Sequence, residues 1–209
     1  MPLGIPNGGG CCWANALTQC LEACGAGVGL GYEALRDAGC PLGRGPQDPH
    51  EALLLAIDAA GDGPLRALVG ARAFASRCTA CGVSERRLED TVVPTIWRGG
   101  VVSRAACCGD AESARAPCAE AGCGGTVVAR VAPQRPPRLA ACHVPEPRKA
   151  SWTAAPVAAA VLRRGGHYVA AVRDGEGGWW VVDDLIVRAV EDSRALALIR
   201  SQGYIVFFR

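Results

Sequence analysis

The sequence has no long apolar run, almost no lysine and no excess of one charge. No stretch approaches the roughly 18 apolar residues that a membrane-spanning helix needs. The formal net charge is +2, and Lys149 is the single lysine. Proteins that bind nucleic acid or anionic membranes through a basic surface usually carry more positive charge than this. We therefore expect neither nucleic acid nor a membrane among the partners.

The first ten residues, MPLGIPNGGG, contain neither the basic start nor the apolar segment of a secretory signal. We therefore expect an intracellular protein. The chain has 12 cysteines in 209 residues, and in a reducing compartment these are free thiols, metal ligands or a nucleophile rather than disulfides.

The length, with 50% hydrophobic and 20% charged residues, predicts one folded domain, 1–209. Apolar residues at helical spacing predict helices at 12–24 and 49–60, the second with Asp48 as its N-cap and Pro49 in its first turn. Further along, a helix is expected at 192–201 and strands at 92–97, 126–132, 138–144, 168–173, 179–183, 185–190 and 204–208. Helices followed by a mostly antiparallel sheet indicate an α+β fold.

One of only three histidines, His167, stands after two glycines at the start of an expected strand. Asp174–Gly175 predicts a hairpin turn after that strand, and Asp183 stands near the end of the returning strand. The two side chains should then lie close together, and the carboxylate would fix the tautomer of the imidazole. The alternative is a surface hairpin with an incidental histidine.

A candidate nucleophile, Cys12, stands at the start of the first expected helix, after three glycines. The helix dipole and unpaired N–H groups stabilise a thiolate there. Cys11 is adjacent and competes for the role. The alternative is that both are core cysteines, which is the common fate of a free cysteine.

Two pairs of cysteines have the spacing of a metal site. Thiolate pairs in an intracellular protein commonly hold structural zinc. The expected ligands are Cys78, Cys81, Cys118 and Cys123, with Cys107 and Cys108 as a rival second pair. The alternative is a knuckle that has lost its metal and keeps its thiols unpaired.

Five segments in order along the chain resemble the landmarks of the ubiquitin-specific protease family. They are the cysteine box at 4–15 with Gln19 and Leu21, the QDPHEAL segment at 47–53, the CTACG knuckle at 78–82, the histidine box at 165–169 with Trp179, Asp183 and Asp184, and the closing strand at 204–208. Together they cover the chain from end to end. The matches are incomplete: Ala14 replaces the family's methionine and Ala52 its phenylalanine.

The resemblance implies a compact papain-like cysteine protease. A helical thumb would occupy about 1–66, and an antiparallel palm with short zinc-knuckle fingers about 67–209. The expected activity is hydrolysis of the bond after the C-terminal glycine of ubiquitin. Alternatives are a protease for a ubiquitin-like modifier, a non-catalytic ubiquitin-binding module and a general papain-like peptidase.

The resemblance also implies roles for single residues. Cys12 matches the nucleophile, with Cys11 in the usual threonine place, and His167 matches the general base. Asp183 matches the residue that orients the imidazole, and Asp184 is its acidic neighbour. Asn7 matches an oxyanion-hole donor.

Two acidic residues have two readings that are compatible. Asp48 and Glu51 have the spacing of an N-cap and its capping-box partner. The family resemblance implies in addition that both face the arginine-bearing tail of the substrate.

Overall fold

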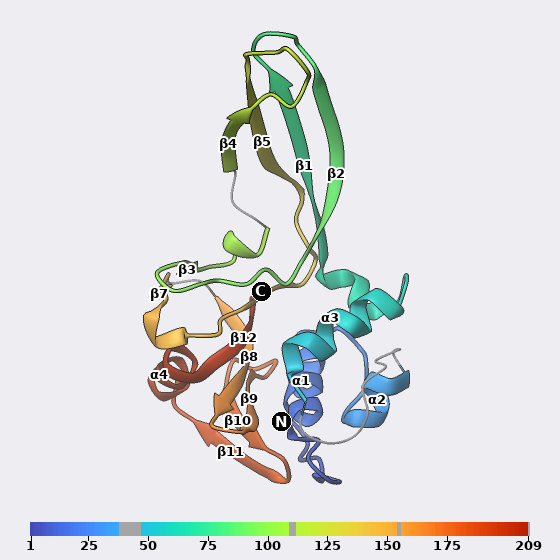
Figure 1. The fold of residues 1–209 in the computed structure, drawn as a ribbon. Coiled ribbons are helices and arrows are strands. Elements are labelled where there is room, and N and C mark those ends of the chain that lie inside the picture. Colours follow the sequence, from blue (N-terminus) through green and yellow to red (C-terminus); the bar gives the residue numbers. More distant parts are fainter. Residues whose placement is uncertain (38–46, 109–111, 154–155, 209) are drawn as a thin grey trace.

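The computed structural model describes residues 1–37, 47–108, 112–153 and 156–208 (Figure 1). The helices are α1 (Cys12–Ala23), α2 (Tyr32–Asp37), α3 (Pro49–Ala59) and α4 (Asp192–Gln202), with 3-10 turns η1 (Pro64–Leu68), η2 (Ala106–Cys108) and η3 (Pro147–Lys149). The strands are β1 (Val69–Cys78), β2 (Ser84–Val92), β3 (Val101–Val102), β4 (Glu112–Pro117), β5 (Thr126–Arg135), β6 (Ala140–His143), β7 (Ser151–Trp152), β8 (Val157–Arg164), β9 (His167–Arg173), β10 (Trp179–Asp183), β11 (Ile186–Val190) and β12 (Gly203–Phe208). Within these described ranges, no helix is long and apolar enough to cross a membrane.

The larger sheet, which we call the palm sheet, has the strand order β11-β10-β9-β8-β12-β6, and all its pairs are antiparallel. Its central strands are apolar on both faces because both faces are covered. Ile205 and Phe207 of β12 pack into the core beneath α1, and Val206 and Phe208 pack into a second core that includes Ile199 of α4. The period of two along a strand thus divides the apolar residues between two cores.

The first helix, α1, is buried along most of its length and packs against β9, β8, α2 and α3. Trp13, Leu17 and Leu21 have no exposed surface. The chain enters this helix through glycines at positive φ, including Gly10 at 78°, a conformation that side chains rarely adopt. The chain therefore turns sharply and enters the core directly at Cys12.

A second sheet, which we call the finger sheet, extends away from the palm (Figure 1). Its strand order is β2-β1-β5-β4, and all pairs are antiparallel. Most side chains of β2 and many of β5 are exposed, so this sheet has little apolar core of its own.

The expected mixed fold of helices and antiparallel sheets is confirmed. The helices expected at 12–24, 49–60 and 192–201 and the strands of the last third are present with small changes at their ends. The strand expected at 92–97 is wrong: β2 ends at Val92, because Val93 has a φ of 33° and Pro94 has no N–H to donate. The strands not expected from the sequence are β1, β2, β3, β4, β7 and β8.

Candidate active site

The hairpin of β9 and β10 brings His167 and Asp183 together. His167 begins β9 and Asp183 ends β10. The turn between the strands is closed by Asp174, whose carboxylate accepts hydrogen bonds from Glu176 N, Gly178 N and the indole N–H of Trp180. The distance between His167 Nε2 and Asp183 Oδ1 is 2.6 Å, a short hydrogen bond to a carboxylate acceptor.

This contact fixes the chemistry of the imidazole. Because Nε2 is bonded to the carboxylate, Nδ1 is the nitrogen left to exchange a proton with a thiol. Both side chains are a little over one-third exposed, so a substrate can approach the ring.

The two adjacent cysteines have different surroundings. Cys11 packs into the core beneath α1. Cys12 is the first residue of α1 and, although only 8% exposed, is not a member of that core cluster. Burial, the Asp48 carboxylate and the Cys12 sulfur together raise the pKa of Tyr168, so Cys12 lies within electrostatic reach of the residue that follows His167. This arrangement favours Cys12 over Cys11 as a reactive thiol.

The start of α1 favours negative charge. Its N-cap residue, Cys11, makes no side-chain capping bond. The first N–H groups of a helix have no partner within the helix, and the helix dipole attracts negative charge to that end. A thiolate or an oxyanion at Cys12 would be stabilised there.

A second polar contact involves Asp184, whose importance the sequence did not reveal. Its two carboxylate oxygens accept from Asn7 Nδ2 at 3.0 Å and from Asn15 Nδ2 at 2.9 Å, and its carbonyl accepts from Ile5 N at 2.9 Å. Asn7 Oδ1 in turn accepts from Cys11 N at 2.9 Å. Asp184 therefore fastens the segment before Cys12 and helix α1 to the end of β10. The Cys-Trp-Ala-Asn pattern contained Asn15, but not its distant partner.

The strand expected at 179–183 is confirmed, and it ends there because Asp184 turns out of it. Asp184 has a φ of 51°, a left-handed conformation that aspartate adopts more readily than most residues. The strand ends at Asp183, and the turn aims the Asp184 side chain at Asn7 and Asn15.

Asp48 is the N-cap of α3, as expected. Its Oδ1 accepts from His50 N at 2.8 Å and from Glu51 N at 3.2 Å, and its Oδ2 accepts from the hydroxyl of Tyr204. Burial opposes ionisation of Asp48, but these donors outweigh it and hold its pKa below the ordinary value. Both oxygens are thus used within the chain, whereas Glu51 is exposed.

The other two histidines stack beside Asp48. The ring centroids of His50 and His143 are 4.0 Å apart at 19°, and His143 also meets the ring of Tyr204 edge-on. Thr95 Oγ1 lies 3.1 Å from His143 Nδ1, while His143 Nε2 is buried with no hydrogen-bond partner in the part of the chain that the structure describes. Burial and the neighbouring His50 lower the pKa of His143 to about 4.

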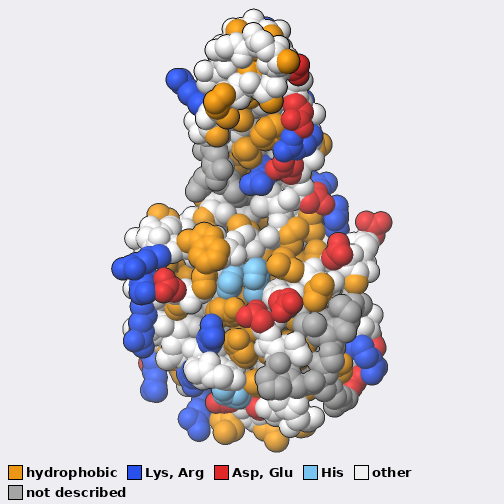
Figure 2. Space-filling model, in the orientation of Figure 1, with side chains coloured by type: hydrophobic (Ala, Val, Ile, Leu, Met, Phe, Trp, Pro, Cys, Tyr) orange, Lys and Arg blue, Asp and Glu red, His pale blue; other side chains and the backbone are white. Residues whose placement is uncertain are grey.

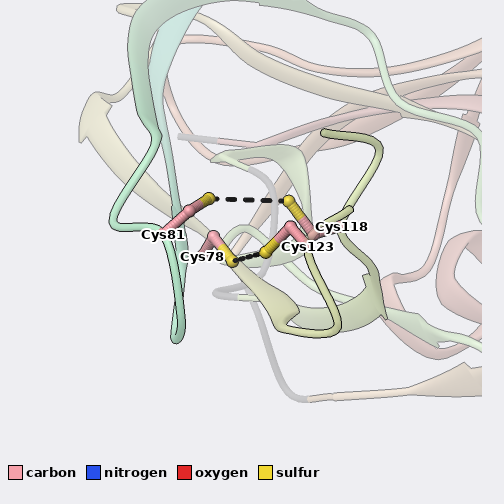
Figure 3. A group of neighbouring side chains, drawn as sticks. All are labelled: Cys78, Cys81, Cys118 and Cys123. Carbon is pink, nitrogen blue, oxygen red and sulfur yellow. Dashed lines mark hydrogen bonds between the residues drawn. The ribbon is translucent and has the colours of Figure 1, made fainter. Parts of the chain in front are cut away.

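Four cysteines converge at the far tip of the finger sheet (Figure 3). Cys78 and Cys81 come from the turn between β1 and β2, and Cys118 and Cys123 from the loop between β4 and β5. Their sulfur atoms all lie within 4.8 Å of one another, so the group could hold a metal ion. Of the rival pair, Cys107 packs in the second core, and the side chain of Cys108 lies outside the part of the chain that the structure describes.

The geometry of the cluster suits a tetrahedral thiolate site. The Sγ atoms of Cys78 and Cys123 are 3.7 Å apart, and those of Cys81 and Cys118 are 3.8 Å apart. Sulfurs at about 2.3 Å from a tetrahedral zinc ion would be about 3.8 Å apart. N–H groups of Ala80 and Cys81 lower the pKa of Cys78 to about 6, whereas hydrogen bonds from neighbouring thiols raise the pKa of Cys81 and of Cys118. The full set of thiolates therefore needs the positive charge of a bound metal ion.

No family model and no curated protein matches this sequence. Solved structures do match. A chain of the SAGA DUB module of Ubp8, Sgf11, Sus1 and Sgf73 bound to monoubiquitin aligns with a TM-score of 0.64 at 12% identity, covering 100% of this chain and 68% of that one. The same module bound to ubiquitin aldehyde gives 0.63 at 12% identity, covering 99% and 69%.

A yeast SAGA DUB module with an Sgf73 mutant also gives a TM-score of 0.63 at 12% identity, covering 99% of this chain and 68% of that one. This chain has the fold of a deubiquitinase module chain. At this identity the likeness shows the fold alone.

Replacing Asp184 with alanine should lower the free energy of unfolding by about 2 kcal/mol, because two hydrogen bonds to a carboxylate are lost and alanine tolerates the positive φ poorly. Asp183→Ala breaks one partly exposed contact between two regular strands and should cost less. Denaturant unfolding of both variants measures the difference. An equal loss in the two variants would show that Asp184 does not fasten these segments together.

Acid should destabilise the protein through His143. In the unfolded chain its pKa is about 6.5, and in the fold it is about 4. Between these values the unfolded chain binds the proton and the fold does not, so the free energy of unfolding falls as pH falls from about 6.5 to about 4. Urea unfolding measured across this pH range should show that the free energy of unfolding declines less steeply in His143→Gln than in the wild type. An equal decline in the two proteins would contradict the assignment to His143.

Proposed function

We propose that this chain is a cysteine-type deubiquitinase that cleaves the peptide or isopeptide bond after the C-terminal glycine of ubiquitin. The observation that carries the proposal is the contact between His167 and Asp183. His167 begins β9, and β9 packs against α1, the helix that begins at Cys12. The likeness in fold to a DUB module chain bound to monoubiquitin adds support.

In the proposed reaction, Nδ1 of His167 takes the proton of the Cys12 thiol, and the thiolate attacks the carbonyl carbon of the terminal glycine. The imidazolium, held by Asp183, then gives its proton to the leaving amine as the C–N bond breaks. A thioester on Cys12 remains. Water attacks it with His167 as base, which releases the glycine carboxylate and restores the thiol.

The oxyanion that forms in each step needs donors close to Cys12. Asn7 Nδ2 has two N–H groups, and the contact with Asp184 uses one of them. We propose that the second N–H, together with the positive end of the α1 helix dipole, stabilises the oxyanion. The bond from Cys11 N to Asn7 Oδ1 holds the amide so that its NH₂ side remains the donor.

For the substrate tail, the structure favours a division of roles that the sequence did not suggest. Asp48 is bonded to Tyr204 and to the start of α3, so we propose that it acts mainly by positioning this wall. The exposed carboxylate of Glu51 is then the more accessible partner for a substrate arginine.

We also propose that Cys78, Cys81, Cys118 and Cys123 hold one structural Zn²⁺, with the thiolate pairs fastening the two loops of the finger tip to each other. The reaction requires no metal at Cys12 or His167. The partner is ubiquitin or a ubiquitin-like modifier and its conjugates, and the intracellular location expected from the sequence remains a prediction.

Cys12→Ser should abolish release of a fluorophore from the C-terminus of ubiquitin, whereas Cys11→Ser should retain most of the activity, because only Cys12 lies outside the core cluster at the start of α1. Initial rates on ubiquitin and on a panel of ubiquitin-like modifiers measure this and identify the preferred modifier. An inactive Cys11→Ser with an active Cys12→Ser would reverse the assignment. Wild-type protein that binds ubiquitin but never releases the fluorophore would indicate a non-catalytic binding module.

Purified protein should contain about one zinc ion per chain, and Cys78→Ser should lose it and lower the melting temperature, because metal binding contributes folding free energy directly. Activity on ubiquitin should fall more than activity on a short C-terminal peptide, since the finger sheet is remote from Cys12. Elemental analysis measures the zinc content, calorimetry measures the melting temperature, and initial rates measure the two activities. Cys24→Ser is the cysteine control outside the cluster. Protein without zinc, or equal loss in the control, would refute the site.

A further inference from the structure

The two faces of the finger sheet differ in charge. Residues opposite each other in antiparallel strands have side chains on the same face. Arg86 of β2 and Arg130 of β5 both pair with Ala75 of β1, and Arg77 lies two residues beyond Ala75 on the same strand. These three arginines therefore share one face.

The edge strand β4 adds a fourth arginine to this face. Arg115 pairs with Val128 of β5, and Val128 pairs with Arg77. All four side chains are exposed. We call the surface formed by Arg77, Arg86, Arg115 and Arg130 the arginine face. In the part of the chain that the structure describes, no carboxylate forms an ion pair with any of them.

The opposite face neutralises its own charge. Arg87 bonds to Glu85 and Glu89 and lies 3.9 Å over the ring of Phe74, and Arg72 bonds to Glu89 at 3.1 Å. Figure 2 shows acidic and basic side chains intermixed along β2.

The arginine face is also hollowed. Arg77, Arg86 and Arg130 line an open groove of about 750 Å³ that continues past Ser84 towards Cys78. Beside it, a second depression is lined by Arg86 and Leu88 together with Phe74 and Arg87 at its border, and the Leu88 side chain is 73% exposed. Guanidinium groups bind carboxylates through two parallel N–H donors, and an exposed leucine adds an apolar contact.

We propose that the arginine face binds an acidic segment of a partner protein, with carboxylates on the guanidinium groups and an apolar side chain on Leu88. Two observations favour a peptide over a nucleic acid. The whole chain has a net charge of only +2, and within the described strands of this sheet the single aromatic residue, Phe74, belongs by register to the other face, where it cannot stack with bases bound here. The surface is remote from Cys12, and the proposal does not depend on the proposed hydrolytic function.

The test is the binding of a fluorescein-labelled peptide in which glutamate pairs flank single leucines, measured by anisotropy with the full chain. The triple variant Arg77→Gln, Arg86→Gln and Arg130→Gln should weaken binding by about tenfold. Each of the three exposed arginine–carboxylate pairs contributes about twofold to the affinity, and the three factors multiply. Replacing the same three arginines with lysine should weaken binding less, because lysine keeps the positive charge and lacks only the two parallel N–H donors of arginine. Higher ionic strength should weaken wild-type binding.

The control is a second glutamine triple at Arg188, Arg194 and Arg200, three exposed arginines of β11 and α4. It changes the net charge by the same amount and should leave the affinity unchanged. Equal weakening in both triples, or no weakening in the first, would overturn the proposal. A single-stranded oligonucleotide that binds more tightly than the peptide and is lost in the first triple would overturn it in favour of nucleic acid.

The melting temperature and the zinc content of the first triple should match the wild type, because the substituted side chains are exposed and lie outside the cysteine cluster. Release of a fluorophore from a short C-terminal peptide should also be unchanged. Failure of the hydrolytic proposal would appear as no turnover in any variant, and it would leave the peptide-binding result standing.

Discussion

The candidate site depends on the packing of α1 against β9. Every residue of α1 from Cys12 to Leu21 is buried, and burying side chains such as Trp13 and Leu17 contributes on the order of 2 kcal/mol each. This packing puts the start of the helix beside the strand that begins with His167. Cys12 is therefore held in place by the core below it.

Apolar packing holds a helix down but fixes its rotation poorly, because the hydrophobic effect has no direction. Directed contacts supply the orientation. The Asp184 carboxylate bonds to Asn7 on the entering segment and to Asn15 on α1, and its neighbour Asp183 bonds to His167. Two adjacent residues at one strand end thus orient both halves of the site, and the turn at Asp184 lets them face different partners.

The parts of the structure that local chemistry specifies were predictable from the sequence. The turn at Asp174 predicted the hairpin, and through it the approach of His167 to Asp183; Asp48 predicted the start of α3. The bond from Asp48 to Tyr204 was not predictable, because its partners are 156 residues apart. The left-handed turn at Asp184 was missed for the same reason, since its cause is a set of distant partners.

The long strands β1 and β2 were missed because they lack the apolar stripe that marks a strand packed on a core. Arg77 and Arg86 occupy places where a core-facing strand would carry valine or isoleucine. Like charges on neighbouring strands destabilise a sheet, and Ala75 separates Arg86 from Arg130 without adding a carboxylate. On the opposite face, Arg72 and Arg87 pair with glutamates, which offsets the repulsion between like charges. The arginine face omits that pairing, so its charges are better explained by an acidic ligand than by the fold.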